Sequence, residues 1–230
     1  MGTQHIVRSY DQDLSKLHGM LEDMGKRSLH ALKTALEALV EVDHALAETV
    51  IEGDRAIDHL EHEIDTFALR MIALRQPMAE DLRRVIVGLK ISSHLERIAD
   101  YATNIARRAI SLQGTKEPLP ALTSLERLGR AVIVLTQDGI HAFLAQDDGL
   151  CKQVRERDCE IDDMYTSYVR ELITFMLEDP RTISASTQLL FVAKNLERIG
   201  DHMTDIVEMV HFMLTGHTFA DPRPKGRKHQ

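Results

Sequence analysis

The sequence has few of the residues that interrupt helices or fill aromatic cores: its 230 residues include no Trp, six Pro and only 4% aromatic side chains. Its hydrophobic residues, 43% of the chain, are therefore mostly aliphatic, and such side chains suit the packing of helix against helix. No apolar run approaches the roughly 20 residues that a membrane-spanning helix needs. The polar N-terminus also lacks the apolar segment of a signal peptide. We therefore expect an all-α, soluble and cytoplasmic protein.

An excess of basic charge and the familiar catalytic motifs are also missing. The formal net charge is −8, which argues against a general nucleic-acid binder, because such proteins carry a basic field. A negative charge is compatible with binding cations or a basic protein. No GxSxG, P-loop or HExxH pattern is present, so we expect no enzymatic activity. Cys151 and Cys159 match no common metal-ligand spacing, so we expect free thiols in a reducing compartment.

One motif occurs twice and organises the chain. Leu-Glu-Arg-Ile-Ala-Asp at 95–100 returns as Leu-Glu-Arg-Ile-Gly-Asp at 196–201, and seven of the fifteen residues in 95–109 are identical in 196–210. Within each copy, apolar residues recur at steps of three and four, which predicts the buried seam of a long helix. A repeat of this length indicates two copies of one supersecondary unit.

The same rhythm of apolar residues extends through most of the chain and predicts three long helices in each half. We expect these helices over about 5–46, 54–74, 78–112, 121–146, 150–177 and 184–214. Short turns between them predict two tandem, pseudo-repeated three-helix bundles over 5–112 and 121–214, with Gly and Pro interrupting the pattern at 113–120. The basic, Pro-containing end of the chain, 215–230, is expected to be a flexible tail.

Carboxylates lie beside the apolar seam in both copies of the motif. Glu96 and Asp100 in the first copy, and Glu197 and Asp201 in the second, are spaced by four and therefore share one helical face. Like charges at this spacing oppose each other by roughly 0.2–0.5 kcal/mol per pair, so either a basic side chain or a bound cation should compensate. Ionised carboxylates supply oxygen ligands, which suit Mg²⁺, Mn²⁺, Ca²⁺ or iron. The pattern therefore predicts one carboxylate metal site in each half.

Acidic residues of the preceding helix could complete each site. Asp54 and Asp58 return as Asp158 and Asp162 at an offset of 104, and we expect Asp58 and Asp162 to contribute ligands. The alternative explanation is that these acids lie near helix starts, where the helix dipole favours them.

Local ion pairing is the alternative explanation for the repeated carboxylates. Arg97, Arg198 and Lys194 each lie three positions from an acid of the motif and could neutralise it without metal. In that case the protein would be a metal-free helical scaffold.

Histidines contribute less to these predictions. His59 and His62 lie three positions apart and could ligate a metal, although the favoured explanation is that they are solvated at the surface. His202 stands where the first copy has Tyr101, so we expect it to lie outside the shared site. Neither copy has the Glu-x-x-His of ferritin-like di-iron proteins. A helical carboxylate-metal protein with a redox or storage role is therefore a second alternative.

Several stretches, in order along the chain, resemble the PhoU family. The motif at 95–100 and 196–202 is similar to the repeated signature of that family, and so are Arg-Gln-Pro-Met-Ala-Glu-Asp-Leu-Arg at 75–83 and Val-Ile-Glu-Gly-Asp at 50–54. The resemblance covers roughly residues 5–215 and implies the family fold of two three-helix bundles.

The resemblance implies a role as well as a fold. PhoU proteins are cytoplasmic regulators of phosphate homeostasis. The resemblance implies an adaptor between the ATPase of the phosphate ABC transporter and the sensor histidine kinase of the phosphate regulon. This adaptor represses the regulon and restrains phosphate uptake. Members often form homodimers and bind metal clusters through a Glu-x-x-x-Asp motif, carried here by Glu96, Asp100, Glu197 and Asp201.

Overall fold

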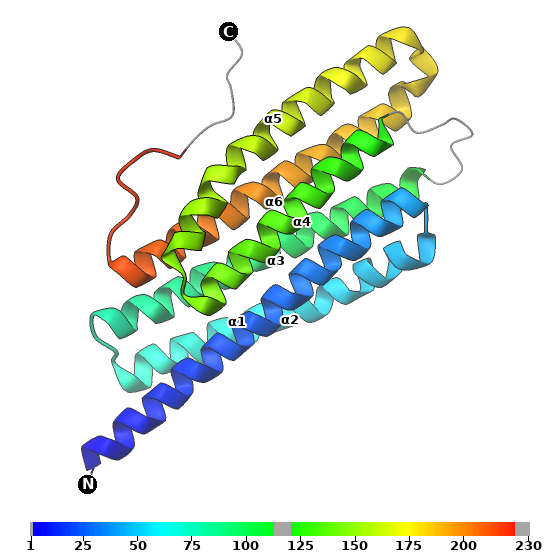
Figure 1. The fold of residues 1–230 in the computed structure, drawn as a ribbon. Helices are drawn as coiled ribbons and strands as arrows, with labels where there is room; N and C mark the ends of the chain where they lie inside the picture. The colour runs from blue at the N-terminus through cyan, green and yellow to red at the C-terminus, as the bar shows by residue number, and fades with distance from the viewer. Residues whose placement is uncertain (1, 113–120, 224–230) are drawn as a thin grey trace.

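The computed structural model describes residues 2–112 and 121–223, and these residues form long helices (Figure 1). In chain order the elements are α1 (Gly2–Glu41), α2 (His44–Arg75), α3 (Glu80–Leu112), α4 (Leu122–Ala145), α5 (Asp148–Glu178), the 3₁₀ turn η1 (Pro180–Thr182) and α6 (Ile183–Thr215). The described residues contain no β-strand, so the prediction of an all-α fold is confirmed.

Helices α1, α2 and α3 form the first bundle, in which each helix packs against the other two. Asp43 caps the N-terminus of α2 by accepting a hydrogen bond from the backbone N–H of Leu46 at 3.1 Å. At the other end of α2, the backbone of Gln76 adopts the left-handed conformation (φ 46°) and Pro77 follows, so the helix cannot continue.

Helix α2 begins earlier than the start that the sequence favours. The sequence favours a start near residue 54, because Gly53-Asp54 resembles a helix boundary, with a helix that runs through from Ala45 as the alternative. The alternative is confirmed, because the helix is continuous from His44. A glycine in a helix interior costs about 1 kcal/mol relative to alanine. The burial of Ala47 and Val50 in the bundle core offsets that cost and carries the helix through Gly53.

Helices α4, α5 and α6 form the second bundle with the same plan. Asp147 caps α5 by accepting a hydrogen bond from the backbone N–H of Leu150 at 3.0 Å. This pair lies 104 positions after the capping pair of α2, the same offset that relates the acidic residues of α2 and α5. The two halves are therefore like bundles, which confirms the predicted pseudo-repeat.

The two helices that carry the motif lie side by side in the centre of the molecule. Helices α3 and α6 run antiparallel along each other, and α1 also contacts α4 (Figure 1). Toward one end Arg108 Nη1 donates to Gln188 Oε1 at 2.8 Å, and toward the other Arg83 Nη1 donates to the carbonyl oxygen of Phe212 at 3.4 Å. The two bundles therefore meet along the α3–α6 seam.

The apolar seams predicted from the motif are buried in a shared core. Those of α3 and α6 comprise Leu95, Ile98, Ala102, Ile105, Ala109, Leu196, Ile199, Met203, Ile206 and Val210. Ser28 of α1 ties into this layer, because its Oγ donates to the carbonyl oxygen of Leu95 at 3.0 Å. Cys151 and Cys159 are free thiols, as expected. No helix in the described part of the chain combines the length and apolarity that crossing a bilayer requires.

Candidate metal centre

Helices α2 and α3 bring together the acidic side chains of the first motif copy and those of the helix before it. We call this group the first carboxylate cluster: Asp54, Asp58, Glu61, Glu96 and Asp100. The charges of Asp58 and Asp100 act on Asp54, and those of Asp100 and Glu61 act on Glu96. The predicted residues of the first half, Glu96, Asp100 and Asp58, therefore lie in one group.

The surroundings of the first carboxylate cluster disfavour the ionised form of its acids. Burial raises the pKa of Glu96 to about 7, and the neighbouring charge of Asp100 adds to the rise. Burial also raises the pKa of Asp54 and of Glu61. Thr103 opposes the rise at Asp54, because its Oγ1 donates a hydrogen bond to Asp54 Oδ1 at 3.0 Å. A cation beside these groups would favour their ionised forms, so the donor set fits a hard metal ion.

Arg97 provides part of the compensating charge in the first carboxylate cluster. Its Nη1 lies 2.9 Å from Asp100 Oδ2 and its Nε 3.4 Å from Glu96 Oε2. The local ion pair proposed as the alternative to metal is therefore present. The Arg97 side chain is 55% exposed, so water weakens its effect on the partly buried carboxylates of Glu96 and Asp100.

Helices α5 and α6 form the second carboxylate cluster, which consists of Asp158, Asp162, Glu197 and Asp201. The charges of Asp162 and Asp201 act on Asp158. Glu197 lies one helical turn before Asp201 and pairs with Lys194, whose Nζ is 2.6 Å from Glu197 Oε2. The predicted residues of the second half therefore lie along two adjacent helices, as their counterparts in the first half do.

A guanidinium from beyond the end of α6 lies in the second carboxylate cluster. Arg223 Nη2 is 2.8 Å from Asp158 Oδ2 and 3.0 Å from Asp201 Oδ1. Its Nη1 is also 3.7 Å from Asp205 Oδ1. Burial raises the pKa of Asp158, and Arg223 opposes that rise. The second cluster thus contains a counter-charge from its own chain.

The segment from Gly216 to Arg223 lies against α5 and α6, although the sequence predicted a flexible tail from residue 215. The ring of Phe219 stacks on His211, with centroids 3.9 Å apart, and Arg155 also lies over the Phe219 ring, 4.5 Å from its centroid. Arg155 Nη2 also donates to the carbonyl oxygen of Asp221 at 2.7 Å. These contacts place Arg223 on the carboxylates. Residues 224–230 of the predicted tail lie outside the described residues.

Two of the expected local explanations, the ion pair between Arg198 and Asp201 and the helix dipole, are not borne out. Arg198 lies over the ring of Tyr101, 5.7 Å from its centroid, and Asp201 pairs with Arg223 instead. The helix-dipole explanation is wrong for Asp54 and Asp158, because α2 begins at His44 and α5 at Asp148. Both acids are therefore well inside their helices, and the dipole acts only within the first turn.

The spacing of the carboxylate oxygens limits how a cation could bind. Among the described residues, no three carboxylates of either cluster have oxygens that all lie within 4.8 Å of one another. A cation at either cluster would therefore keep water ligands or draw the side chains together. Mg²⁺ commonly retains several waters and uses one or two carboxylates. Metal binding by Glu96, Asp100, Asp58, Glu197, Asp201 and Asp162 stays a prediction.

Sequence reasoning overlooked two contributors to the clusters, Glu61 and Arg223. Asp158, which is only 3% exposed and lies at the centre of the second cluster, was a possible ligand through its match to Asp54 at the offset of 104, although Asp162 was preferred. Glu61 has Tyr165 at the equivalent position, and Arg223 lies outside the repeat, so comparison of the halves points to neither.

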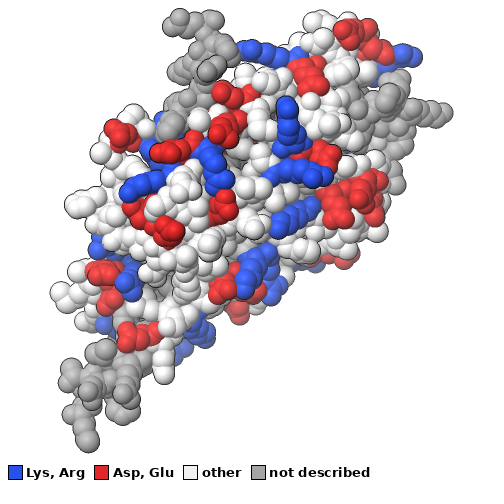
Figure 2. All heavy atoms as spheres, viewed as in Figure 1, with Lys and Arg blue, Asp and Glu red and all other residues white. Residues whose placement is uncertain are grey.

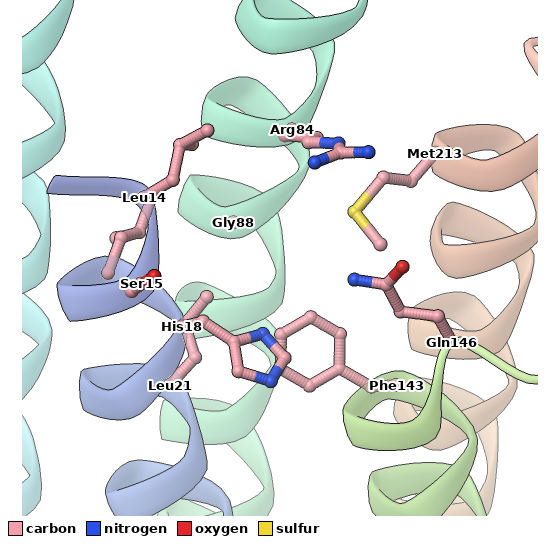
Figure 3. A pocket seen from close by; sticks show the side chains of 10 residues that line it. Leu14, Ser15, His18, Leu21, Arg84, Gly88, Phe143, Gln146 and Met213 are labelled. Carbon is pink, nitrogen blue, oxygen red and sulfur yellow. The ribbon is translucent and has the colours of Figure 1, made fainter. Parts of the chain in front are cut away.

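A separate pocket lies between the two bundles, away from both clusters. It has a volume of about 300 Å³, and α1, α3, α4 and α6 contribute its walls (Figure 3). The rings of His18 and Phe143 face each other in it, with centroids 4.9 Å apart. The lining residues are Leu14, Ser15, Leu17, His18, Leu21, Arg84, Gly88, Phe143, Gln146 and Met213. None of them belongs to either carboxylate cluster.

Known proteins match the chain over nearly its full length. The PhoU domain matches twice, over residues 21–109 and 125–210. A phosphate-specific transport system accessory protein PhoU homolog from Caulobacter vibrioides (strain NA1000 / CB15N) is 46% identical over 224 residues, which are 97% of each chain. The phosphate-specific transport system accessory protein PhoU of Escherichia coli (strain K12) is 37% identical over 94% of this chain and 89% of its own.

Solved structures agree with these matches. The crystal structure of PhoU from Pseudomonas aeruginosa superposes with a TM-score of 0.88 at 36% identity and covers 90% of this chain and 100% of its own. The phosphate transport system regulatory protein PhoU from Streptococcus pneumoniae has a TM-score of 0.84 at 28% identity, over 91% of this chain and 99% of its own. With both repeats, the whole length and the three-dimensional fold in agreement, the chain belongs to the PhoU family.

Proposed function

We propose that this chain is an accessory protein of a phosphate-specific transport system and takes part in regulating phosphate transport. The observation that carries this proposal is similarity over the whole chain. Relatives from two bacteria that bear this name match 97% and 94% of the chain. Both PhoU domains are present in order, so the similarity includes both bundles and the α3–α6 seam between them.

The finer proposal is that the chain works in the cytoplasm as an adaptor. It would contact the ATPase of the phosphate ABC transporter and the sensor histidine kinase of the phosphate regulon, hold the kinase in its repressing state and restrain phosphate uptake. We propose that it does so as a homodimer.

Exposed apolar side chains at the two ends of the molecule support binding to protein partners. At the α2–α3 turn, Leu74 is 68% and Met78 80% exposed. At the α5–α6 turn, Leu177 is 80% and Ile183 48% exposed. The two turns lie at opposite ends of the bundle pair (Figure 1). Apolar side chains gathered at an exposed turn are typical of protein contact surfaces.

The charged surface also suits protein partners. On the face shown in Figure 2, Lys and Arg are interspersed with Asp and Glu and do not form a field of one sign. Such a surface pairs with a partner of matching mixed charge, which favours a specific register.

Retention of the two partners tests the adaptor role. The tagged chain would be expressed in cells that lack their own copy, and proteins bound to it would be recovered at high and low phosphate. We expect the transporter ATPase and the sensor kinase in the recovered fraction, and restored repression of a phosphate-regulon reporter at high phosphate. Absence of both partners, with an unrepressed reporter, would contradict the proposal. Light scattering of the purified chain tests the homodimer separately.

We further propose that each carboxylate cluster holds a hard cation such as Mg²⁺, Mn²⁺, Ca²⁺ or iron. Glu96, Asp100 and Asp58 would hold it in the first half, and Glu197, Asp201 and Asp162 in the second. The raised pKa of Glu96, caused by burial and by Asp100, supports the first site. A bound cation would neutralise the clustered carboxylates and so fix α2 against α3 and α5 against α6.

Metal analysis of charge-neutralised variants tests this site. We expect Mn²⁺ binding by equilibrium dialysis to fall in the double variant Glu96→Gln and Asp100→Asn, and in the double variant Glu197→Gln and Asp201→Asn. A matched control neutralises two exposed acids of α1 that pair with Lys26 and Arg27, through Glu22→Gln and Asp23→Asn. Equal Mn²⁺ binding in all three variants and the unmodified chain would remove the assignment.

A further inference from the structure

The α3–α6 seam contains two imidazoles and a carboxylate that converge outside the predicted clusters. His94 of α3 faces His202 of α6, and their Nδ1 atoms are 2.8 Å apart. Asp205, three positions after His202 and hence on the same helical face, has Oδ2 at 3.8 Å from His94 Nδ1. Among the described residues, these three side chains are the group whose ligand atoms all lie within 4.8 Å of one another.

We propose that His94, His202 and Asp205 bind a divalent transition-metal ion of the zinc type, and that this ion joins the two bundles. Two imidazoles and one carboxylate are a donor set that suits Zn²⁺ and its neighbours rather than Mg²⁺ or Ca²⁺. The proposed site, which we call the seam site, therefore differs in chemistry from the carboxylate clusters.

The geometry of the seam site needs only a small adjustment to hold such an ion. Bonds of about 2.0–2.1 Å place two ligand atoms of a tetrahedral zinc site about 3.3 Å apart. The two separations measured here, 2.8 Å and 3.8 Å, lie on either side of that value. His94 is 21% exposed and Asp205 39%, so both rotate within a partly open surface. Three protein ligands leave a fourth position for water.

The surroundings of the seam site also favour a metal ligand role for the two rings. The two rings are partly buried at the α3–α6 seam and stand edge to face, with centroids 5.0 Å apart. The ring of Tyr101 stacks on His202, with centroids 5.6 Å apart, and fixes its plane. His94 and Asp205 line a pocket of about 430 Å³ between α3 and α6, which gives an ion a path from solvent.

Four positive charges act on the seam site, and two of them, Arg97 and Arg223, also pair with acids. Arg97, Arg198 and Arg223 all act on His202, and Lys90 acts on His94. Arg97 pairs with the first carboxylate cluster and Arg223 with the second. Asp205 directs one carboxylate oxygen toward Arg223 and the other toward His94. Its charge is therefore shared between the second cluster and the seam site.

The pseudo-repeat supplies an internal comparison for the seam site. Shifting each residue by the motif offset of 101 replaces His94, His202 and Asp205 by Asn195, Tyr101 and Asn104. These residues lack an imidazole and a carboxylate, so the equivalent place across the seam offers no comparable ligand set. The seam site would therefore bind one ion per chain.

Zinc titration of matched variants tests the seam site. The variants His94→Asn and His202→Tyr each install the residue that the other half has at the equivalent position. We expect each to lower Zn²⁺ affinity by more than about 100-fold, because loss of even an outer partner of a ligand costs 10–100-fold. A triple variant that combines Glu96→Gln, Asp100→Asn and Glu197→Gln should bind Zn²⁺ at the seam site with unchanged affinity. Zinc affinity that follows the carboxylates and ignores both histidines would overturn the proposal.

A second measurement uses the unmodified chain and does not depend on how the variants fold. Diethyl pyrocarbonate modifies accessible histidines, and peptide mass spectrometry locates the modified residues. We expect Zn²⁺ to protect His94 and His202, while His59, which is 74% exposed on α2, remains reactive. Equal modification of His94 and His202 with and without Zn²⁺ would overturn the assignment. This result is independent of whether the carboxylate clusters bind their own cations.

Discussion

Arg223 reaches back from beyond α6 to Asp158, with Nη2 2.8 Å from Oδ2, and so brings a positive charge to the buried acid of the second carboxylate cluster. Asp158 is 3% exposed, so an ionised carboxylate there needs a partner. A metal ion and the Arg223 guanidinium would each supply the positive charge that the ionised Asp158 carboxylate requires, and they would occupy the same place. The docking of the segment 216–223 and cation binding are therefore expected to compete.

Replacing Arg223 should strengthen cation binding in the second half. We expect Arg223→Gln to raise Mn²⁺ affinity by at least tenfold, because like charges about 4 Å apart repel by several kcal/mol at the effective dielectric of a protein surface. The measurement is calorimetric titration with Mn²⁺ in the Glu96→Gln and Asp100→Asn background, which removes two carboxylates of the first cluster. The control Lys152→Gln removes an exposed ion pair with Asp148. Equal affinity in both variants would show that Arg223 does not compete.

The raised pKa of Glu96 predicts how stability changes with pH. Its pKa is about 7 in the folded chain against an ordinary 4.5, so between these values the folded state binds more protons than the unfolded state. The free energy of unfolding should therefore fall as pH rises from 4.5 to 7. Glu96→Gln should remove this penalty and stabilise the chain above pH 7 by about 1–2 kcal/mol, after allowance for solvent screening.

The measurement for Glu96 is urea unfolding between pH 4 and 8 with a chelator present. Below pH 4.5 the variant and the unmodified chain should have similar stability, because the glutamate is then protonated in both states. Glu52→Gln, at an exposed position of the same bundle, serves as the control. A Glu96→Gln variant without a stability gain at pH 8 would contradict the expected charge strain.

Much of the fold follows from patterns that lie within one helix or repeat between halves. The apolar steps of Leu95, Ile98 and Ala102 predict their burial, because a helix brings every third or fourth residue to one face. The preferred start of α2 near residue 54 was wrong because Gly53 is only a local signal. The burial that keeps the helix intact there depends on packing against α1 and α3.

Helical periodicity and the internal repeat could not predict the contacts across the α3–α6 seam or those made by the segment after α6. Comparison of the halves aligns His202 with Tyr101 and so excludes it from a shared site, whereas the fold sets it against His94 from the other half. Arg223 lies in a basic, Pro-containing stretch whose composition predicts disorder. Only the positions of Phe219 and Arg155 in space explain why that stretch docks.

The exposed apolar residues at the two turns should affect partner binding without affecting the fold. We expect Leu177→Glu or Met78→Glu to lower retention of one partner by about tenfold or more, because truncating a central apolar contact costs about 1–2 kcal/mol or more. Both side chains are 80% exposed, so the free energy of unfolding should change by less than about 0.5 kcal/mol. Comparing the ATPase and kinase recovered with each variant would assign a turn to each partner. Unaltered retention of both partners would exclude these turns.

Equivalent core residues test whether the two bundles fold as one unit. Ile98 of α3 and Ile199 of α6 are both fully buried and belong to one continuous apolar core. Replacing either by alanine should lower the free energy of unfolding by about 2–5 kcal/mol, through lost burial and the cavity left behind. Because α3 and α6 pack along each other, either change should shift one common urea transition. Circular dichroism and a spectroscopic probe placed in the other half should report the same midpoint.

Ile173→Ala, at a position 47% exposed, should leave the midpoint nearly unchanged. Two separate transitions, with each variant moving only its own, would instead mean that the seam does not couple the halves.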